Sequence, residues 1–255
     1  MSTPDRVHTE RHRAESFGSV AAEYDAARPS YPAQLVDDLL AAEPADVLDV
    51  GCGTGKAGRL FVARGVPVLG VEIDPQMAAV ARSHGLEVDV AAFEAWDARD
   101  RRFDLIVCGQ AWHWIVPGVG VPKAAALLRP GGRLALFWNR SELDEDVRAV
   151  LDEVYRRHAP ELLAPHRDKD DPPYAHDLDG SGLFEPVEER EYRWEQTYRR
   201  DEWLALIGTH SDHVVLPDGQ RAALLAAVGA AIDRMGGQLA AHYRTRAMLA
   251  RVTRR

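Results

Sequence analysis

Three glycines at alternate positions, Gly51, Gly53 and Gly55, directly follow a short apolar run in the sequence A-D-V-L-D-V-G-C-G-T-G. Glycine adopts positive φ without strain and allows a ligand to contact main-chain atoms closely. The pattern indicates a buried strand that enters a tight turn and continues into a helix. This stretch therefore predicts a site for a flat, polar ligand.

An acidic residue, Glu72, closes the next apolar run of the chain. A carboxylate at the carboxyl end of a second parallel strand can accept hydrogen bonds from both hydroxyls of a ribose. The dinucleotide fingerprint G-x-G-x-x-G would require a glycine where Lys56 stands, whereas the spacing here is G-x-G-x-G. Both patterns recognise an adenosyl group, so the glycine spacing must decide between them.

Two stretches of the sequence resemble the class I S-adenosylmethionine-dependent methyltransferases. They are V-L-D-V-G-C-G-T-G at residues 47–55 and G-V-E-I-D-P at residues 70–75. Residues 110–114, Q-A-W-H-W, resemble the segment after the fourth strand in a subset related to trans-aconitate methyltransferase. The resemblance implies S-adenosyl-L-methionine as cofactor and S-adenosyl-L-homocysteine as product. It also implies a small-molecule acceptor.

The resemblance further implies which residues bind the cofactor. They are Tyr24, Arg28, Asp49, Gly51, Cys52, Gly53, Thr54, Gly55, Glu72, Ile73, Met77, Phe93, Glu94, Gln110 and Ala111. Asp49 is expected to brace the glycine turn near the methionyl amine, and Asp74 to cap the helix at Pro75, which leaves Glu72 for the ribose. Phe93 would cover the adenine, and Glu94 or the backbone would accept its amino group; a simply exposed Glu94 is the alternative.

His113 is the candidate catalytic residue, because an imidazole can accept the acceptor's proton as the methyl group transfers. The alternative is a packed, hydrogen-bonded histidine between two tryptophans. The expected substrate-binding residues are Tyr31, Trp112, His113, Trp114, Trp203 and His210. Arginines and histidines, among them Arg28 and Arg140, would favour an anionic acceptor. The aromatic residues would favour an aromatic acceptor, so the sequence does not decide the chemical class of the acceptor.

The core of the chain alternates strands with helices, as α/β folds do. The predicted strands are 47–50, 68–72, 86–91, 103–108 and 133–137, with helices at 56–64, 75–83 and 122–128. Crossovers of this length make the strands parallel, and ligands of such sheets bind outside the strands' carboxyl ends. Two amphipathic helices, one around 16–24 and one at 33–42, precede the first strand. They would lie over the site or, alternatively, only cover the core.

Beyond residue 137 the alternation stops. We predict a capping box at Ser141 and Asp144, ahead of a helix with an apolar face made of Leu143, Val147, Val150, Leu151 and Val154. We then predict a solvated loop or lid at 159–182 and a strand through 192–198. After these we predict helices at 203–207 and 224–235 and a last strand at 243–252. The predicted fold is α/β, a Rossmann-like doubly wound seven-stranded sheet, mostly parallel with an antiparallel final strand, plus an N-terminal helical cap.

We expect one domain over residues 1–255, with a cap at 1–42, a cofactor-binding core at 43–140 and a substrate-side part at 141–255. The composition, 46% hydrophobic and 28% charged, is that of a globular protein. The longest apolar stretch, 222–232, is too short to span a bilayer, so no membrane association and a cytoplasmic location are expected. Cys52 and Cys108 are expected to be reduced, and no metal site is expected.

A D-P-P-Y sequence at 171–174 resembles the motif of enzymes that methylate adenine in DNA, but it does not follow the fourth strand. We therefore predict a proline-rich turn there. The net charge of -9 also disfavours a nucleic-acid partner.

The predicted function is in-line methyl transfer to O, N or C of a small molecule by a monomer or homodimer, driven mainly by orientation. A non-catalytic sensor or scaffold that binds S-adenosylmethionine, and less favourably a nucleic-acid methyltransferase, are the alternatives.

Overall fold

One mixed sheet organises the protein. The computed structural model describes residues 21–163 and 174–253 of the chain. The sheet has seven strands in the order β3-β2-β1-β4-β5-β7-β6. The strands are β1 (Val47–Val50), β2 (Val68–Glu72), β3 (Glu87–Val90), β4 (Phe103–Gly109), β5 (Leu128–Leu143), β6 (Glu188–Arg199) and β7 (Gln238–Arg251). β7 runs antiparallel to both of its neighbours and the first five strands pair in parallel, which confirms the predicted fold class.

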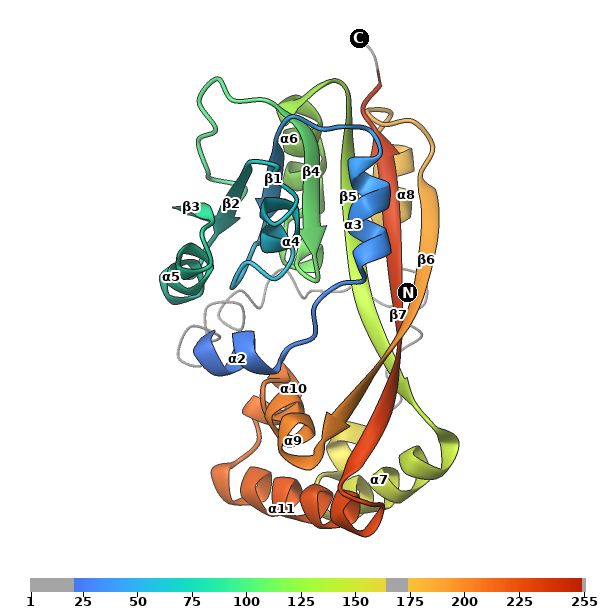
Figure 1. The fold of residues 1–255 in the computed structure, drawn as a ribbon. Coiled ribbons are helices and arrows are strands. Elements are labelled where there is room, and N and C mark those ends of the chain that lie inside the picture. Colours follow the sequence, from blue (N-terminus) through green and yellow to red (C-terminus); the bar gives the residue numbers. More distant parts are fainter. Residues whose placement is uncertain (1–20, 164–173, 254–255) are drawn as a thin grey trace, which may run out of the picture.

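The helices fall into two groups. Around the parallel strands lie α3 (Ala33–Leu40), α4 (Gly58–Val62), α5 (Pro75–Ser83), α6 (Pro117–Leu127), α8 (Tyr174–Gly180) and the 3-10 helix η3 (Trp112–Trp114). The second group is α7 (Glu145–His158), the 3-10 helix η4 (Pro160–Leu163), α9 (Arg200–Gly208), α10 (Ser211–Val214) and α11 (Asp218–Arg234). The short helix α2 (Ala21–Ala27) lies between the groups (Figure 1). No helix in the described ranges is long and apolar enough to cross a membrane.

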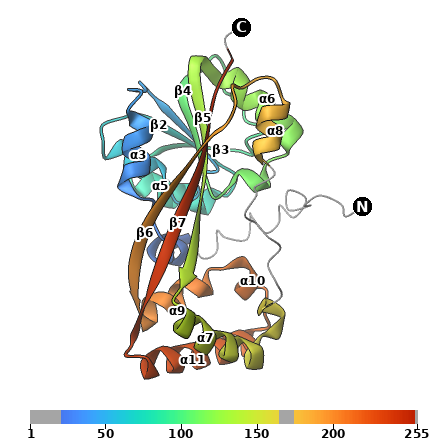
Figure 2. The ribbon, with the colours of Figure 1, turned by 90° about the vertical axis from the view of Figure 1, so that its right-hand side faces the viewer.

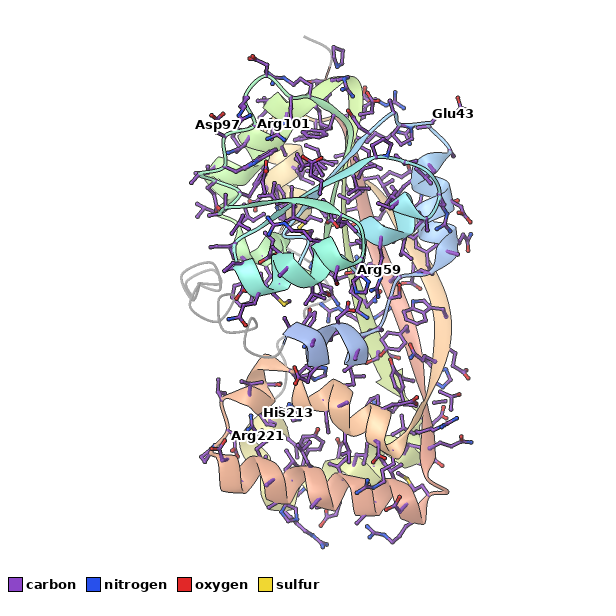
Figure 3. All side chains as sticks on the ribbon, turned by 60° about the vertical axis from the view of Figure 1, so that its left-hand side comes forward. Glu43, Arg59, Asp97, Arg101, His213 and Arg221 are labelled. Atoms are coloured by element: carbon purple, nitrogen blue, oxygen red, sulfur yellow. The ribbon has the colours of Figure 1, made fainter. Side chains whose placement is uncertain are left out.

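These groups form two lobes. In the core lobe, one buried cluster packs α3, α4 and α5 against one face of the sheet, and another packs α6 and α8 against the other face. In the helical lobe, α7, α9 and α11 enclose a third cluster that includes Leu224, Val228 and Ile232. Figure 3 places Arg59 in the core lobe and His213 in the helical lobe, on either side of α2.

Three long strands connect the lobes. β5 pairs with β7 from Arg133↔Arg251 to Leu143↔Ala241, and β6 pairs with β7 along its whole length. Figures 1 and 2 show these strands running from the core lobe into the helical lobe. The predicted fifth strand ended at residue 137 because the polar run that follows breaks the apolar pattern. In the structure that run continues the strand, because β7 supplies its hydrogen-bonding partners.

Several local predictions beyond this point are wrong. Ser141 lies in β5, and Asp144 flanks α7 without a side-chain cap bond, bonding His242 at 3.0 Å instead, so no capping box forms. Val150 is 39% exposed rather than part of the apolar face. The predicted loop at 159–182 contains η4 and α8, and Leu178 of α8 is fully buried in the core lobe. The D-P-P-Y residues 171–173 lie outside the described residues, and the tyrosine begins α8.

Candidate functional site

A cavity of about 320 Å³ lies at the carboxyl ends of β1, β2 and β4. We call it the first cavity. It is lined by nearly all of the predicted cofactor-binding residues: Tyr24, Arg28, Asp49, Gly51, Cys52, Gly53, Thr54, Glu72, Ile73, Met77, Phe93, Glu94, Gln110 and Ala111. Tyr31, His113 and Trp114, predicted to bind substrate, also line it. The structure therefore brings together side chains from five separate segments of the chain.

The glycine turn has the backbone geometry that its sequence requires. Gly51, Gly53 and Gly55 have φ values of 63°, 56° and 84°, in the left-handed region that favours glycine. A Cβ on Gly51 would lie 2.7 Å from the Cβ of Ala111, which is closer than real atoms approach. Gly55 does not line the cavity; its Cα faces Ala81 and Leu86, so it serves the packing of the turn against α5.

Glu72 is held in place by backbone donors at the end of β2. Its carboxylate accepts hydrogen bonds from the N–H groups of Gly53, at 2.8 Å, and Asp74, at 3.0 Å. Burial raises the pKa of Glu72, and these hydrogen bonds oppose the rise. Each oxygen keeps a further lone pair for a ligand. Asp74 accepts hydrogen bonds from the N–H groups of Gln76 and Met77, which confirms it as the N-cap of α5.

Asp49 is a fully buried carboxylate at the end of β1. It accepts a hydrogen bond from the N–H of Gly58 at 2.9 Å and so braces the turn that carries the glycines. Burial, reinforced by the nearby charge of Glu72, raises its pKa to about 7. A cationic group in the first cavity would stabilise the ionised form.

Phe93 and Glu94 follow β3. The ring of Phe93 is 4% exposed and reaches the cavity wall. Glu94 is partly buried rather than simply exposed, and its Oε1 accepts a hydrogen bond from the N–H of Val116 at 3.0 Å. This bond ties the segment after β3 to the start of α6.

Helix α2 covers one side of the first cavity. Tyr24 lines the cavity, and the guanidinium carbon of Arg28 lies 5.0 Å from the centre of its ring. On the same helix, Asp25 contacts three cationic or titratable groups of the core lobe: His84 at 2.8 Å, Arg59 at 3.3 Å and Lys56 at 4.0 Å. One carboxylate thus attaches the helix to both α5 and the glycine turn.

The Q-A-W-H-W segment follows β4 and divides into two environments. His113 and Trp114 line the first cavity, and their ring centres are 4.7 Å apart. Trp112 is fully buried, with its ring centre 6.3 Å from that of Phe93, and it lines neither cavity described here. We expected Trp112 to bind substrate, but η3 turns its ring into the core.

A second cavity of about 410 Å³ lies between the lobes. It is lined by Arg28, Pro29, Gln110, Asn139, Arg140, Ser141, Trp203, Leu206, His210, Asp212 and Tyr243. The two cavities share the first four of these residues, so they adjoin. Trp203 and His210, which we expected to bind substrate, line this second cavity and not the first.

Sequence reasoning missed the contributions of Asn139, Ser141 and Tyr243. A signal for the first two existed: the polar run N-R-S directly follows the apolar part of the fifth parallel strand, where ligand-binding residues of such sheets gather. No such signal marks Tyr243, which lies opposite Ser141 only through the pairing of β5 with β7.

Gln110 stands at the boundary of the cavities. It has a φ of 61°, an uncommon conformation for a residue with a side chain. Its Nε2 donates to the carbonyl of Asn139 at 3.2 Å. The side chain of Asn139 in turn donates to the carbonyl of Ser30 and accepts from Thr245. This network fixes the chain before α3 to β4, β5 and β7.

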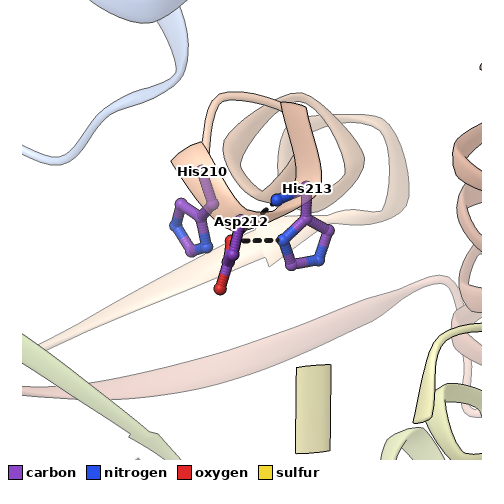
Figure 4. Close-up of side chains that lie close together, drawn as sticks. All are labelled: His210, Asp212 and His213. Carbon is purple, nitrogen blue, oxygen red and sulfur yellow. Dashed lines mark hydrogen bonds and ion pairs between the residues drawn. The ribbon is translucent and has the colours of Figure 1, made fainter. Parts of the chain in front are cut away.

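His210, Asp212 and His213 place three potential metal-ligand atoms within 4.8 Å of one another (Figure 4). The ring of His213 bonds Asp212 and Tyr155, each at 2.7 Å. One tautomer satisfies both contacts, with Nδ1–H donating to Asp212 and Nε2 accepting from the Tyr155 hydroxyl. Burial and the charge of Arg28 lower the pKa of His210 to about 3. That nearby positive charge opposes a cation, so we assign the cluster to hydrogen bonding.

Residues 47–132 match the family model of the methyltransferase domain. Over 132 residues the chain is 42% identical to an uncharacterised methyltransferase of Mycobacterium tuberculosis, covering 51% of this chain and 54% of that protein. A ubiquinone biosynthesis O-methyltransferase of Alkalilimnicola ehrlichii is 32% identical over 115 residues, covering 42% of this chain and 45% of that protein. The chain thus spans about half the length of the curated relatives that it matches.

The fold has a counterpart along most of the chain. The solved structure of a proposed type II methyltransferase from Anaeromyxobacter dehalogenans matches with a TM-score of 0.63, covering 89% of this chain and 99% of that one at 24% identity. At that identity the likeness concerns the fold alone. Residues 47–132 are therefore similar to a methyltransferase domain, and the seven-stranded fold as a whole is similar to that of the solved structure.

Proposed function

We propose that this protein, whose residues 47–132 match the family model of the methyltransferase domain, transfers a methyl group from S-adenosyl-L-methionine to a small molecule. The observation that carries the proposal is the glycine turn hydrogen-bonded to Glu72 on the wall of the first cavity. Gly53 donates its N–H to that carboxylate at 2.8 Å, so the turn and the acidic strand end form one rigid unit.

The residues of the first cavity suit an adenosyl-methionine ligand. A Cβ on Gly51 would lie 2.7 Å from that of Ala111, so only glycine lets the turn pack this closely against the segment after β4. Glu72 would accept the ribose hydroxyls, and Asp49 lies where the methionyl amine is expected. Phe93 would cover the adenine. The chemistry that S-adenosylmethionine supplies when bound is an electrophilic methyl group on a sulfonium.

The remaining residues orient the reactants and exclude water. Tyr24 and Arg28 cover the first cavity from the side of α2, and Gln110 separates it from the second cavity. A lone pair of an acceptor held in the second cavity would then reach the first one at this boundary. Orientation of this kind can supply most of the rate enhancement. His113, on the wall of the first cavity, would take up the acceptor's proton.

The second cavity is the proposed acceptor site. Trp203 and His210 line it, as expected of substrate-binding residues. The relative from Alkalilimnicola ehrlichii, an O-methyltransferase of ubiquinone biosynthesis, is named for chemistry on a small molecule. We propose a small-molecule acceptor for this protein too. We also propose that it is a cytoplasmic enzyme of the trans-aconitate methyltransferase-like group. It would act as one domain, in a monomer or a homodimer.

Calorimetric titration with S-adenosylmethionine tests the proposal. Glu72→Ala should weaken binding about tenfold or more, about 1.4 kcal/mol, because a strong hydrogen-bonding partner is lost. Glu72→Gln keeps one acceptor oxygen and so loses one of the two backbone hydrogen bonds, from Gly53 or Asp74, and thermal unfolding of both variants shows whether the turn is retained. The control is Glu87→Ala, an exposed acid in β3 outside the cavity. Unchanged affinity in both Glu72 variants would refute the ribose assignment.

Turnover is tested by incubating the protein with S-adenosylmethionine and a panel of small carboxylates, phenols and amines. Mass detection of a gain of one methyl group identifies an acceptor. Binding of S-adenosylmethionine without any product would favour a sensor over an enzyme. His113→Gln should then lower kcat with little change in S-adenosylmethionine affinity if the imidazole accepts the proton.

A further inference from the structure

Two hydrogen-bond donors beside the second cavity lack acceptors. The indole Nε1–H of Trp203 and the Nε–H of Arg28 are buried and have no hydrogen-bonding partner among the described residues. Trp203 is only 7% exposed, and both residues line the second cavity. A buried donor without a partner costs roughly 1–3 kcal/mol, so such groups usually mark a missing ligand or water. Both groups can only donate, so a ligand must offer acceptor atoms.

Two neighbouring polar side chains, those of Asn139 and Tyr243, already have hydrogen-bonding partners. Asn139 donates to Ser30 at 2.9 Å and accepts from Thr245 at 2.7 Å. The hydroxyl of Tyr243 bonds that of Tyr198 at 2.7 Å. The donors of Trp203 and Arg28 are therefore the groups of this wall that most need an acceptor.

The charges on the wall favour an anion. Two arginines, Arg28 and Arg140, line the second cavity together with a single acidic residue, Asp212. Asp212 accepts hydrogen bonds from the ring of His213 at 2.7 Å and from its backbone N–H at 2.8 Å, which reduce its repulsion of an anion. Nη2 of Arg28 donates to the carbonyl of Thr209 at 2.8 Å, which fixes this guanidinium beside the cavity.

The rest of the wall is less polar. Pro29, Leu206 and the ring of Trp203 line the cavity together with the charged groups. An acceptor that combines an acidic group with a small organic body would therefore complement both parts. The volume of about 410 Å³ allows a molecule of that size.

We propose that the second cavity binds the acidic group, a carboxylate or a phosphate, of the methyl acceptor through Arg28, Arg140 and the indole N–H of Trp203. This inference rests on the proposed function, because only a methyltransferase has a methyl acceptor. The anion site itself can be tested without any turnover.

The test is calorimetric titration of the protein loaded with S-adenosylhomocysteine. The probes are succinate, its uncharged analogue succinamide, and inorganic phosphate. Arg140→Gln removes one charge, and Trp203→Phe removes the indole N–H but keeps an aromatic ring. Arg193→Gln is the matched control, because that arginine lies in β6, is 82% exposed and lines neither cavity.

We expect succinate to bind at least tenfold more tightly than succinamide. Arg140→Gln should weaken succinate binding about tenfold and Trp203→Phe about threefold, whereas Arg193→Gln should change nothing. Stronger binding of phosphate than of succinate would support a phosphate ester, and the reverse order a carboxylic acid. Equal affinity for succinate and succinamide, or unchanged succinate affinity in Arg140→Gln, would overturn the proposal.

A separate titration with S-adenosylhomocysteine distinguishes the two failures. None of the three variants should alter its affinity, because neither Arg140 nor Trp203 nor Arg193 lines the first cavity. If the unmodified protein bound no S-adenosylhomocysteine, the proposed function would fail. The succinate titration of the ligand-free protein would still decide whether the second cavity is an anion site.

Discussion

The two adjoining cavities are built in different ways. The first is made largely of short consecutive segments at the ends of neighbouring strands, among them the turn with Gly51 and Gly53 at positive φ. The second is made of side chains from the segment before α3, the ends of β4 and β5, the helices α9 and α10, and β7. A turn at positive φ demands glycine at a fixed spacing, which leaves a clear pattern in the sequence. A wall of side chains from distant elements leaves a weaker one.

The difference predicts that the cavities can be damaged separately. The first depends on the turn after β1 and on Glu72, whereas the second depends on how the helical lobe sits on the long strands. Each of the following experiments changes one region and measures the effect on the other.

The largest effect is expected from the core of the helical lobe. Leu224→Ala removes a fully buried side chain of α11 and should lower the free energy of unfolding by about 2–5 kcal/mol. Chemical denaturation measures this loss, and Leu225→Ala, a partly buried neighbour, should cost less. Affinity for S-adenosylmethionine should stay within about threefold at temperatures where the variant is folded. A parallel fall in that affinity would show that the lobes do not act separately.

Gly51→Ala should damage the first cavity alone. The new Cβ would meet that of Ala111 at 2.7 Å, and alanine is strained at a φ of 63°. We expect S-adenosylmethionine affinity to fall about a hundredfold, about 2.7 kcal/mol, while succinate binding stays unchanged. Gly219→Ala is the control, because a Cβ there has no neighbour within 4 Å. Normal calorimetric affinity in Gly51→Ala would contradict the requirement for glycine at this position of the turn.

The pH dependence of binding should report on Asp49. Its pKa of about 7 means that the carboxylate becomes charged as the pH rises through 7, so affinity for a cationic ligand should increase several-fold between pH 6 and pH 8. Asp49→Asn should flatten that profile and still accept from Gly58. A profile as steep in Asp49→Asn as in the unmodified protein would remove Asp49 from the role.

The raised pKa of Asp49 also makes the free energy of unfolding depend on pH. This dependence runs in the direction opposite to that of ligand affinity. The folded state holds this proton more tightly than the unfolded state, whose pKa is about 3.9. The contribution of Asp49 to the free energy of unfolding is therefore full below that pH and is lost as the pH rises through 7. Comparing the pH profiles of unfolding for the unmodified protein and Asp49→Asn isolates it.

The smallest effect is expected where α2 attaches to the core lobe. Asp25→Asn should weaken the contacts with His84 and Arg59 and speed the release of S-adenosylmethionine two- to threefold in stopped-flow measurements, since partly exposed ion pairs contribute about 0.2–1 kcal/mol. The control is Asp37→Asn, which breaks the ion pair between Asp37 on α3 and Arg64. It should leave the release of S-adenosylmethionine unchanged. Equal rates in the two variants would argue against α2 as a cover.

The sequence predicted the core lobe well for physical reasons. Strands β1 and β2 and helix α5 have the predicted bounds, because buried parallel strands read as apolar runs and Asp74 with Pro75 marks a helix start. Nearly all of the predicted cofactor-binding residues line one cavity. Outside the core lobe the prediction weakened. The second half of β5 is polar and partly exposed, so only its pairing with β7 shows that it is a strand.

Residue roles that depend on pairing could not be predicted. Trp112 and Trp114 look equivalent in the sequence, but one ring is fully buried and the other lines the first cavity. Asn139 and Tyr243 reach the second cavity from strands that are adjacent only in the folded sheet.

The continuous pairing of β5, β7 and β6 constrains how this protein can change over evolutionary time. Alternate residues of a strand face opposite sides, so inserting or deleting one residue in β5 ahead of Asn139 would move Asn139 from its place opposite Thr245 to one opposite Arg244 or Arg246, with its side chain on the other face. The spacing between the two cavities is thus set by a count of residues in three strands. New acceptor preferences would therefore arise by substitution on these strands, and changes of length would be confined to the connections between helices.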